Sequence, residues 1–146
     1  MAPLLILLVT TGLARLVGWL GYAPLDGWST AVALGLAAMF LVTGSAHFTP
    51  AKRRGMVMMV PPVLPRPDLL VTITGVLELA GAVGLLVPLT RGLAAGCLAL
   101  LLVVMFPANW RVQTKFRQSP MVSMPLWART LTQVVFLAAC LVVVVG

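Results

Sequence analysis

The sequence predicts an all-α integral membrane protein, and three observations carry that prediction. Hydrophobic residues make up 61% of the 146 residues and charged residues only 9%, whereas a soluble domain is about half apolar and about a quarter charged. So few polar side chains cannot cover a surface that faces water. The apolar residues also form five runs, each near the ~20 residues that a spanning helix needs. We therefore expect a single transmembrane domain over residues 1–146 and no separate soluble domain.

The five apolar runs give the boundaries of the expected spans. They cover residues 3–21, 29–48, 68–87, 92–110 and 125–145. The first run follows no basic segment and precedes no clear cleavage site, so we expect a retained helix rather than a signal peptide. In the alternative arrangement the chain has four spans, and the first run lies in the membrane interface.

The basic residues gather in two of the loops between the runs. Loops 49–67 and 111–124 together hold seven Lys and Arg residues, whereas the opposite loops hold Arg91 and Asp26. Because cytoplasmic loops are enriched in Lys and Arg, we expect both basic loops and the N-terminus to be cytoplasmic. This rule also explains the net charge of +7. Membrane lipids are thus the expected partners, and nucleic acid is not.

Polar residues within the apolar runs are the candidate functional residues, because polar groups are costly in lipid and need partners there. Glu78 lies near the middle of the 68–87 run, on a face that it shares with Gly75 and Gly81. Small residues permit close approach of helices, so we expect Glu78 to point into the bundle. There it either stays protonated or meets a cation, and Arg129 is the candidate cation.

Counting helical rise at about 1.5 Å per residue brings further polar groups to the same cytoplasmic half of the bundle. The predicted cluster consists of His47, Glu78, Asn109, Arg129 and Gln133. We interpret this cluster as a ligand-binding site. The alternative is a structural role, in which these side chains only satisfy one another and fix how the helices pack.

A proline-rich segment, residues 60–67, is expected at the mouth of this cluster. Proline disfavours a helix and fixes an extended or turned backbone. The segment is also largely apolar, so we expect either a lid against the bundle or a connector that stays close to the membrane. The prolines concerned are Pro61, Pro62, Pro65 and Pro67.

The remaining unusual residues receive simpler interpretations. We expect Arg15 to extend to the lipid headgroups, and Cys97 and Cys140 to be packing residues rather than a disulfide. One His and two distant Cys residues predict no metal site. Motifs for a nucleophile–base pair, a phosphate-binding loop or a dinucleotide site do not appear, so we expect no independent catalysis.

Ordered motifs extend over about residues 35–141. They include Gly44-Ser45-Ala46-His47-Phe48, Met59-Val60-Pro61-Pro62-Val63-Leu64-Pro65-Arg66-Pro67, Gly75-Val76-Leu77-Glu78, Phe106-Pro107-Ala108-Asn109 and Trp127-Ala128-Arg129-Thr130-Leu131-Thr132-Gln133. In these motifs the chain resembles the DoxX-like family of small bacterial membrane proteins. The resemblance implies a four-helix bundle in the bacterial inner membrane, to which the 3–21 run adds one helix. It also implies an association with membrane oxidoreductases, some of which are linked to quinones.

Two functions fit these expectations. In the first, the chain is a non-catalytic membrane subunit that binds a quinone-like or lipid-like molecule, in association with a membrane oxidoreductase system. An apolar cleft with a few convergent polar groups is typical of such sites. In the alternative, the chain is a non-catalytic accessory, structural or assembly subunit of a larger membrane complex, and a homo-oligomer would count against this alternative. The exposed helix faces of the chain would be the functional surface in this alternative.

Overall fold

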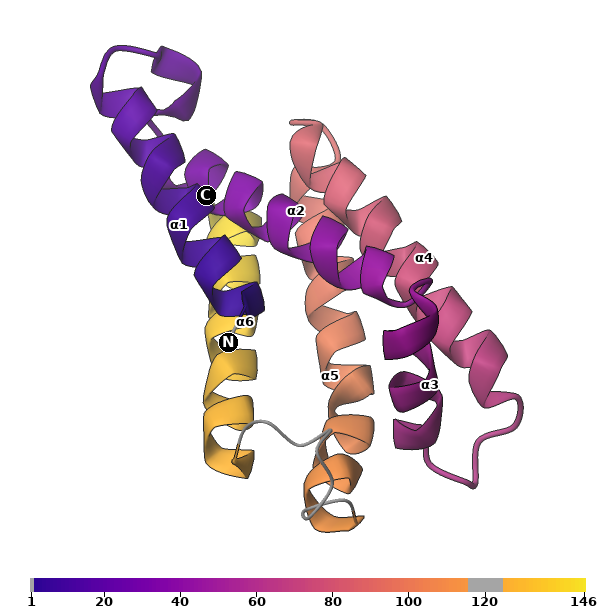
Figure 1. The fold of residues 1–146 in the computed structure, drawn as a ribbon. Coiled ribbons are helices and arrows are strands. Elements are labelled where there is room, and N and C mark those ends of the chain that lie inside the picture. The colour runs from indigo at the N-terminus through magenta and orange to yellow at the C-terminus, as the bar shows by residue number, and fades with distance from the viewer. Residues whose placement is uncertain (1, 116–124) are drawn as a thin grey trace.

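The structure, a computed structural model, describes residues 2–115 and 125–146, without the side chains of residues 112–115 and 126. All its elements are helical: α1 (Ala2–Trp19), the short 3-10 helix η1 (Ala23–Leu25), α2 (Trp28–Ala46), α3 (Pro50–Met59), α4 (Pro67–Leu86), α5 (Arg91–Lys115) and α6 (Leu126–Val145). Five of these helices, all but α3 and η1, are long and apolar enough to span a membrane. The prediction of an all-α protein with five candidate spans is thus confirmed for the described residues (Figure 1).

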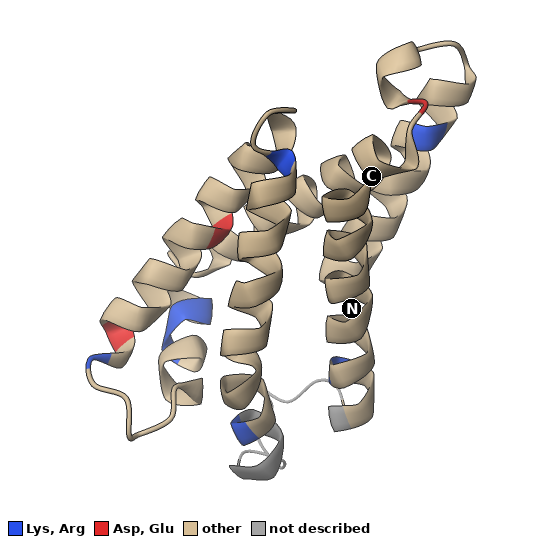
Figure 2. Ribbon diagram, turned by 180° about the vertical axis from the view of Figure 1, so that it is seen from behind, with Lys and Arg blue, Asp and Glu red and all other residues tan. Residues whose placement is uncertain are grey.

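Helix α2 lies at the centre of the bundle. It packs against α1, α4 and α6, and α5 packs against both α4 and α6. The short helix α3 contacts α4 and α5, near the end where α6 begins (Figure 1). This end therefore collects α3, the first turns of α4 and α6, and the last turns of α5. We call it the basic end, because α3 carries Lys52, Arg53 and Arg54; Figure 2 shows the Lys and Arg positions.

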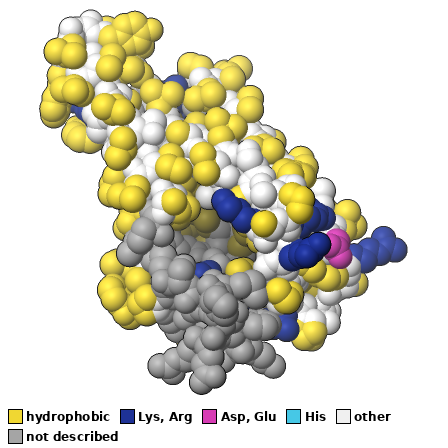
Figure 3. Space-filling model, in the orientation of Figure 1, with side chains coloured by type: hydrophobic (Ala, Val, Ile, Leu, Met, Phe, Trp, Pro, Cys, Tyr) yellow, Lys and Arg dark blue, Asp and Glu magenta, His cyan; other side chains and the backbone are white. Residues whose placement is uncertain are grey.

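The outer surface is mostly hydrophobic, as helices that face lipid require. Large apolar side chains on the outer faces, such as Leu13 of α1, Leu100 of α5 and Leu131 of α6, are each more than half exposed. Figure 3 shows hydrophobic side chains over most of the visible face, with the Lys and Arg side chains gathered toward one part of it. Such a surface is unsuited to water and suited to acyl chains.

The buried core is built around α2. The largest fully buried side chains are contributed by four helices, and they are Leu36, Met39 and Phe40 of α2, Leu85 of α4, Leu98 of α5 and Cys140 of α6. Helix α2 also has small buried residues, including Ala33 and Ala37. Small side chains allow neighbouring helices to approach the α2 backbone closely, which explains its central place.

Two glycines of α4 mark its closest contacts with neighbouring helices. A Cβ atom added at Gly75 would lie 2.6 Å from the Cβ of His47 on α2. At Gly81, an added Cβ would lie 2.6 Å from side-chain carbons of Leu98 on α5. These separations are shorter than real contacts between carbon atoms, so a larger residue would push the helices apart. Glu78, which lies between the two glycines, is buried.

Both segments predicted as basic loops contain helical residues. Residues 50–59 form α3 within the expected loop 49–67. Proline fits the first turn of a helix, so Pro50 starts α3 and Pro67 starts α4. Helix α5 continues past Pro107 to Lys115, into the expected loop 111–124. Arg117, which also contributes to the predicted charge of that loop, lies outside the described residues.

Arg15, which we expect to extend to the lipid headgroups, reaches the turn between α1 and α2 and finds partners within the protein there. Its side chain is buried, and its Nη1 donates hydrogen bonds to the backbone carbonyls of Leu25, at 3.3 Å, and Asp26. The same nitrogen lies 3.4 Å from the Asp26 carboxylate. The guanidinium lies 5.3 Å and 4.7 Å from the ring centroids of Trp19 and Trp28. Nearby acceptors and aromatic rings therefore stabilise this charge within the turn that joins α1 to α2.

Candidate functional site

The five polar residues predicted as one cluster lie in two separate clusters. The α2–α4 cluster consists of Thr43, His47 and Glu78. The α5–α6 cluster consists of Asn109, Arg129 and Gln133. The expected Glu78–Arg129 ion pair is not among the interactions of the described residues: Glu78 interacts with α2, and Arg129 with α5.

In the α2–α4 cluster the Glu78 carboxylate has two partners on α2. Thr43 Oγ1 donates a hydrogen bond to Glu78 Oε2 at 2.6 Å. His47 Nε2 lies 3.9 Å from Glu78 Oε1, which is too long for a direct hydrogen bond but close enough for attraction when the imidazole is protonated. Both the His47 and the Glu78 side chains are almost fully buried. Glu78 thus links α2 to α4 at a level where an unpaired polar group would be costly.

The orientation of the His47 ring follows from its second nitrogen. Nδ1 lies 3.0 Å from the backbone carbonyl of Thr43. A carbonyl oxygen only accepts, so Nδ1 carries the proton, and the lone pair of a neutral imidazole then lies on Nε2, toward Glu78. Arg53 of α3 holds the same region from outside, because its Nη1 donates to the His47 carbonyl at 3.1 Å.

Arg53 also connects α3 to the start of α4. Its Nη2 donates to the carbonyl of Asp68 at 2.9 Å and to the hydroxyl of Thr72 at 2.8 Å. One guanidinium therefore joins the C-terminal end of α2, the basic helix α3 and the first turns of α4. The five N–H donors of Arg suit a junction with several acceptors.

In the α5–α6 cluster the hydrogen bonds form a chain that runs in one direction. Arg129 Nη1 donates to Asn109 Oδ1 at 3.4 Å, and Asn109 Nδ2 donates to Gln133 Oε1 at 3.3 Å. Gln133 Nε2 then donates to the backbone carbonyl of Leu102 at 2.7 Å. The chain therefore ends on the backbone of α5 at Leu102, five residues before Pro107, and joins α6 to α5.

A cavity of about 240 Å³ opens beside the α5–α6 cluster. The three cluster residues provide most of its polar lining, and its other walls are largely apolar; the full lining consists of Pro3, Leu4, Leu102, Asn109, Arg129, Thr132, Gln133 and Phe136. Arg129 Nε is buried and has no hydrogen-bond partner in the described structure. Gln133 also lines a second cavity of about 280 Å³, together with Val103, Phe106 and Leu137. Two cavities therefore adjoin Gln133 at the interface between α5 and α6.

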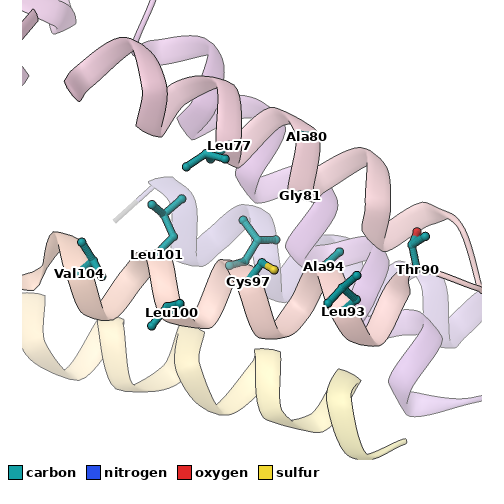
Figure 4. A pocket seen from close by; sticks show the side chains of 11 residues that line it. Leu77, Ala80, Gly81, Thr90, Leu93, Ala94, Cys97, Leu100, Leu101 and Val104 are labelled. Atoms are coloured by element: carbon teal, nitrogen blue, oxygen red, sulfur yellow. The ribbon is translucent and has the colours of Figure 1, made fainter. Parts of the chain in front are cut away.

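Glu78 and His47 line none of the three cavities described for the structure. The third of these is an apolar groove of about 540 Å³ between α4 and α5. Figure 4 shows its walls, to which Leu77 of α4 and Leu93, Cys97 and Leu101 of α5 contribute. It offers almost no polar group for a ligand. Among the described cavities, the one that combines polar and apolar lining lies beside Arg129, whereas the sequence predicts a cleft at a cluster that also contains Glu78 and His47.

The proline-rich segment and the cysteines have no polar role in either cluster. Pro62 and Pro65 are exposed, whereas Pro61 and Pro67 are half-buried, so the segment has the character of a connector. It is anchored through the Val60 carbonyl, which accepts a hydrogen bond from Arg111 of α5.

Both cysteines are free thiols, with Cys97 exposed and Cys140 buried. The described residues contain no group of three or more His, Cys, Asp or Glu side chains that could hold a metal ion.

Sequence reasoning missed Thr43, which belongs to the α2–α4 cluster, and Arg53, which contacts this cluster from α3. Thr43 lies one helical turn before His47, so i, i+4 spacing would have placed both residues on one face of α2. Arg53 belongs to a segment whose Lys and Arg residues predict only which side of the membrane it lies on. Its contacts with Thr72 and the Asp68 carbonyl depend on how α3 folds back on α4, which spacing along the chain does not reveal.

Comparison with known proteins gives one family match. A family model described as "Domain of unknown function (DUF8561)" matches residues 36–144. The match extends from within α2 to the last turn of α6 and leaves α1 outside it. Both clusters therefore lie within the matched region. No curated protein and no solved structure matches the chain.

Proposed function

Because the chain belongs to the DUF8561 family, whose description states no activity, we propose a function from the geometry of the site. The protein is a small multi-pass membrane protein that binds a quinone-like or lipid-like molecule in the α5–α6 cavity. The observation that carries this proposal is the Arg129–Asn109–Gln133 chain, which lines an otherwise largely apolar cavity within candidate spanning helices.

The cavity suits the head of an amphiphile better than a whole ligand. Its volume, about 240 Å³, lies below the ~300–1,000 Å³ of pockets that enclose drug-sized molecules. Arg129 and Asn109 offer hydrogen bonds to a polar head, whereas Leu102 and Phe136 offer apolar contact to the adjoining part of a tail. A few oriented polar groups in an apolar wall are what determines how such a ligand sits.

The charge distribution supports a cytoplasmic location for the basic end, in a bacterial inner membrane. Lys52, Arg53 and Arg54 on α3 lie at this end, and Lys and Arg are enriched on the cytoplasmic side. Pro3 and Leu4 line the same cavity as Arg129 and Phe136, so the start of α1 lies beside the first half of α6, and α1 runs in the same general direction as α6 (Figure 1). With five spans, the N-terminus is then cytoplasmic and residue 146 lies on the opposite side.

The DoxX-like resemblance supports an association with a membrane oxidoreductase system. In this role the chain supplies a binding site for a quinone or lipid and catalyses nothing by itself. A second candidate is a non-catalytic assembly subunit of a larger membrane complex. The groove between α4 and α5 favours it, because a partner helix could cover the exposed side chains of Leu93 and Leu100.

Cavity filling tests the proposed binding site. The protein is purified in a mild detergent, and bound amphiphiles are identified by native mass spectrometry and lipid extraction. We expect a co-purified amphiphile in the wild type and less of it in Leu102→Phe, whose larger side chain enters the cavity. Leu131→Phe is the matched control, because Leu131 lies on α6 but is exposed and lines none of the described cavities.

Two results would count against the binding proposal. Equal loss in Leu102→Phe and Leu131→Phe would show that the amphiphile does not occupy this cavity. A protein that purifies without any amphiphile but with a stoichiometric protein companion would favour the assembly subunit instead.

A further inference from the structure

The chain contains three carboxylate side chains, Asp26, Glu78 and Asp68, and none of them is a partner of Arg129. Asp26 lies 3.4 Å from Arg15. Glu78 accepts the hydrogen bond from Thr43 and faces His47. Asp68 is exposed in the first turn of α4. Residues 116–124 add no Asp or Glu to the sequence, so residues 1–146 contain no further side-chain carboxylate for Arg129.

Arg129 therefore lies in the candidate span Trp127–Val145 without a carboxylate among the described residues. A charged side chain within a membrane is costly, and it usually pairs with an opposite charge or faces a polar cavity. Here the cavity is present, and the Nε donor of Arg129 is buried without a partner. The opposite charge is what the described site lacks.

The direction of the hydrogen-bond chain defines which ligand atoms fit. Asn109 Oδ1 already accepts from Arg129, and Gln133 Oε1 accepts from Asn109. Each amide oxygen thus has a donor within the chain, whose last acceptor is the Leu102 carbonyl. The buried cluster atom without any partner in the described structure is Arg129 Nε, so the complementary ligand atom is an acceptor, and a negative charge on it would compensate the guanidinium.

We propose that the α5–α6 cavity binds an anionic amphiphile, whose phosphate or carboxylate head pairs with Arg129 and whose tail lies along the apolar walls. This inference rests on the proposed function and specifies the ligand class of the same site. A guanidinium pairs well with either head, because its planar N–H donors match two oxygens at once. A neutral quinone ring would satisfy the donor but leave the charge uncompensated.

Binding of three probes to the intact protein in phosphatidylcholine nanodiscs tests this inference. The probes are phosphatidylglycerol, which has a phosphate head, oleic acid, which has a carboxylate, and decylubiquinone, which is neutral. Native mass spectrometry of the released protein gives the apparent affinity for each. We expect at least one anionic probe to bind more tightly than decylubiquinone, and the probe that binds identifies phospholipid or fatty acid as the source of the anion.

Three variants distinguish the effect of the Arg129 charge on ligand binding from the effect of the other positive charges at the basic end. Arg129→Gln should weaken anionic binding about tenfold or more, because a charge-assisted hydrogen bond is lost. Arg129→Lys keeps the charge and should retain a preference for the anionic probes. Arg54→Gln removes an exposed charge at the same end of the bundle and should change binding by less than about twofold. If Arg129→Gln does not fold, Arg129→Lys still reports on the preference.

The outcomes distinguish this inference from the function on which it rests. Decylubiquinone binding as tight as that of the anionic probes, or equal effects of Arg129→Gln and Arg54→Gln, would overturn the anionic ligand but leave an amphiphile site in place. Failure of all three probes to bind would overturn the proposed function itself.

Discussion

Arg129 Nη1 donates a hydrogen bond to Asn109 Oδ1 across the contact between α6 and α5, at 3.4 Å. Glu78, the side chain that sequence reasoning assigns to Arg129, instead accepts from Thr43 on α2. This arrangement separates two tasks in the bundle. The α2–α4 cluster joins helices, and the α5–α6 cluster borders a cavity.

The first prediction concerns Glu78 as a structural residue. Glu78→Ala should lower the free energy of unfolding by about 1–3 kcal/mol, because the half-buried Thr43 hydroxyl loses its acceptor at 2.6 Å and keeps only the Phe40 carbonyl at 3.5 Å. Glu78→Gln keeps an acceptor oxygen and should cost less. Reversible unfolding in sodium dodecyl sulfate measures both values, and the ligand assay described above should give wild-type amphiphile binding for Glu78→Gln. Loss of binding in a folded Glu78→Gln protein would instead place Glu78 in the ligand site.

The second prediction concerns the approach of α4 to α2. Gly75→Ala should destabilise the protein by about 1–3 kcal/mol, because the new methyl group overlaps His47. Gly96→Ala is the matched control, since a Cβ at Gly96 meets nothing within 4 Å. It should be neutral or stabilise α5 by up to about 1 kcal/mol through helix propensity. Similar unfolding curves for the two variants would contradict the close packing at Gly75.

The third prediction concerns the attachment of α3. Arg53→Ala should increase hydrogen exchange over residues 50–59, because the hydrogen bonds to His47, Asp68 and Thr72 are lost. The neighbouring Arg54 is exposed, so Arg54→Ala should leave exchange in α3 nearly unchanged. Hydrogen-exchange mass spectrometry in nanodiscs compares the two. Equal protection in Arg53→Ala and the wild type would mean that other contacts hold α3.

The fourth prediction concerns the two thiols. Cys97 is exposed and borders the groove between α4 and α5, whereas Cys140 is buried. A lipid-soluble maleimide should therefore label Cys97 in the folded protein, and Cys140 only after unfolding. Peptide mass spectrometry locates the label, and Cys97→Ala should abolish labelling of the native state. Rapid labelling of Cys140 in folded Cys97→Ala would show that the core around α6 is open.

The helices themselves were predictable, because long apolar runs leave few alternatives in a membrane. The inward direction of Glu78 was also predictable, since it shares a helix face with Gly75 and Gly81. Helix α3 was missed because Lys52, Arg53 and Arg54 interrupt the apolar pattern. Its start nevertheless has a local signal, Thr49 followed by Pro50, which is typical of a helix N-terminus.

The partner of each polar residue was not predictable from depth alone. Counting residues predicts that Glu78 and Gln133 lie in the same half of the bundle, but this count does not say which helices are neighbours. Helix α4 packs against α2 and α5, and α6 packs against α5 and α2. Glu78 therefore meets His47, whereas Gln133 meets Asn109. The periodicity of a sequence predicts which residues share one face of a helix. Which neighbouring helix that face contacts depends on tertiary packing.

A density map of the protein isolated with its native lipids tests the central claim most directly. We predict a non-protein head group in the cavity between α5 and α6, with an anionic oxygen at about 2.7–2.9 Å from the Arg129 guanidinium and a tail beside Leu102 and Phe136. A well-resolved cavity that holds only water or rearranged side chains, with Arg129 turned toward the aqueous phase, would contradict the claim.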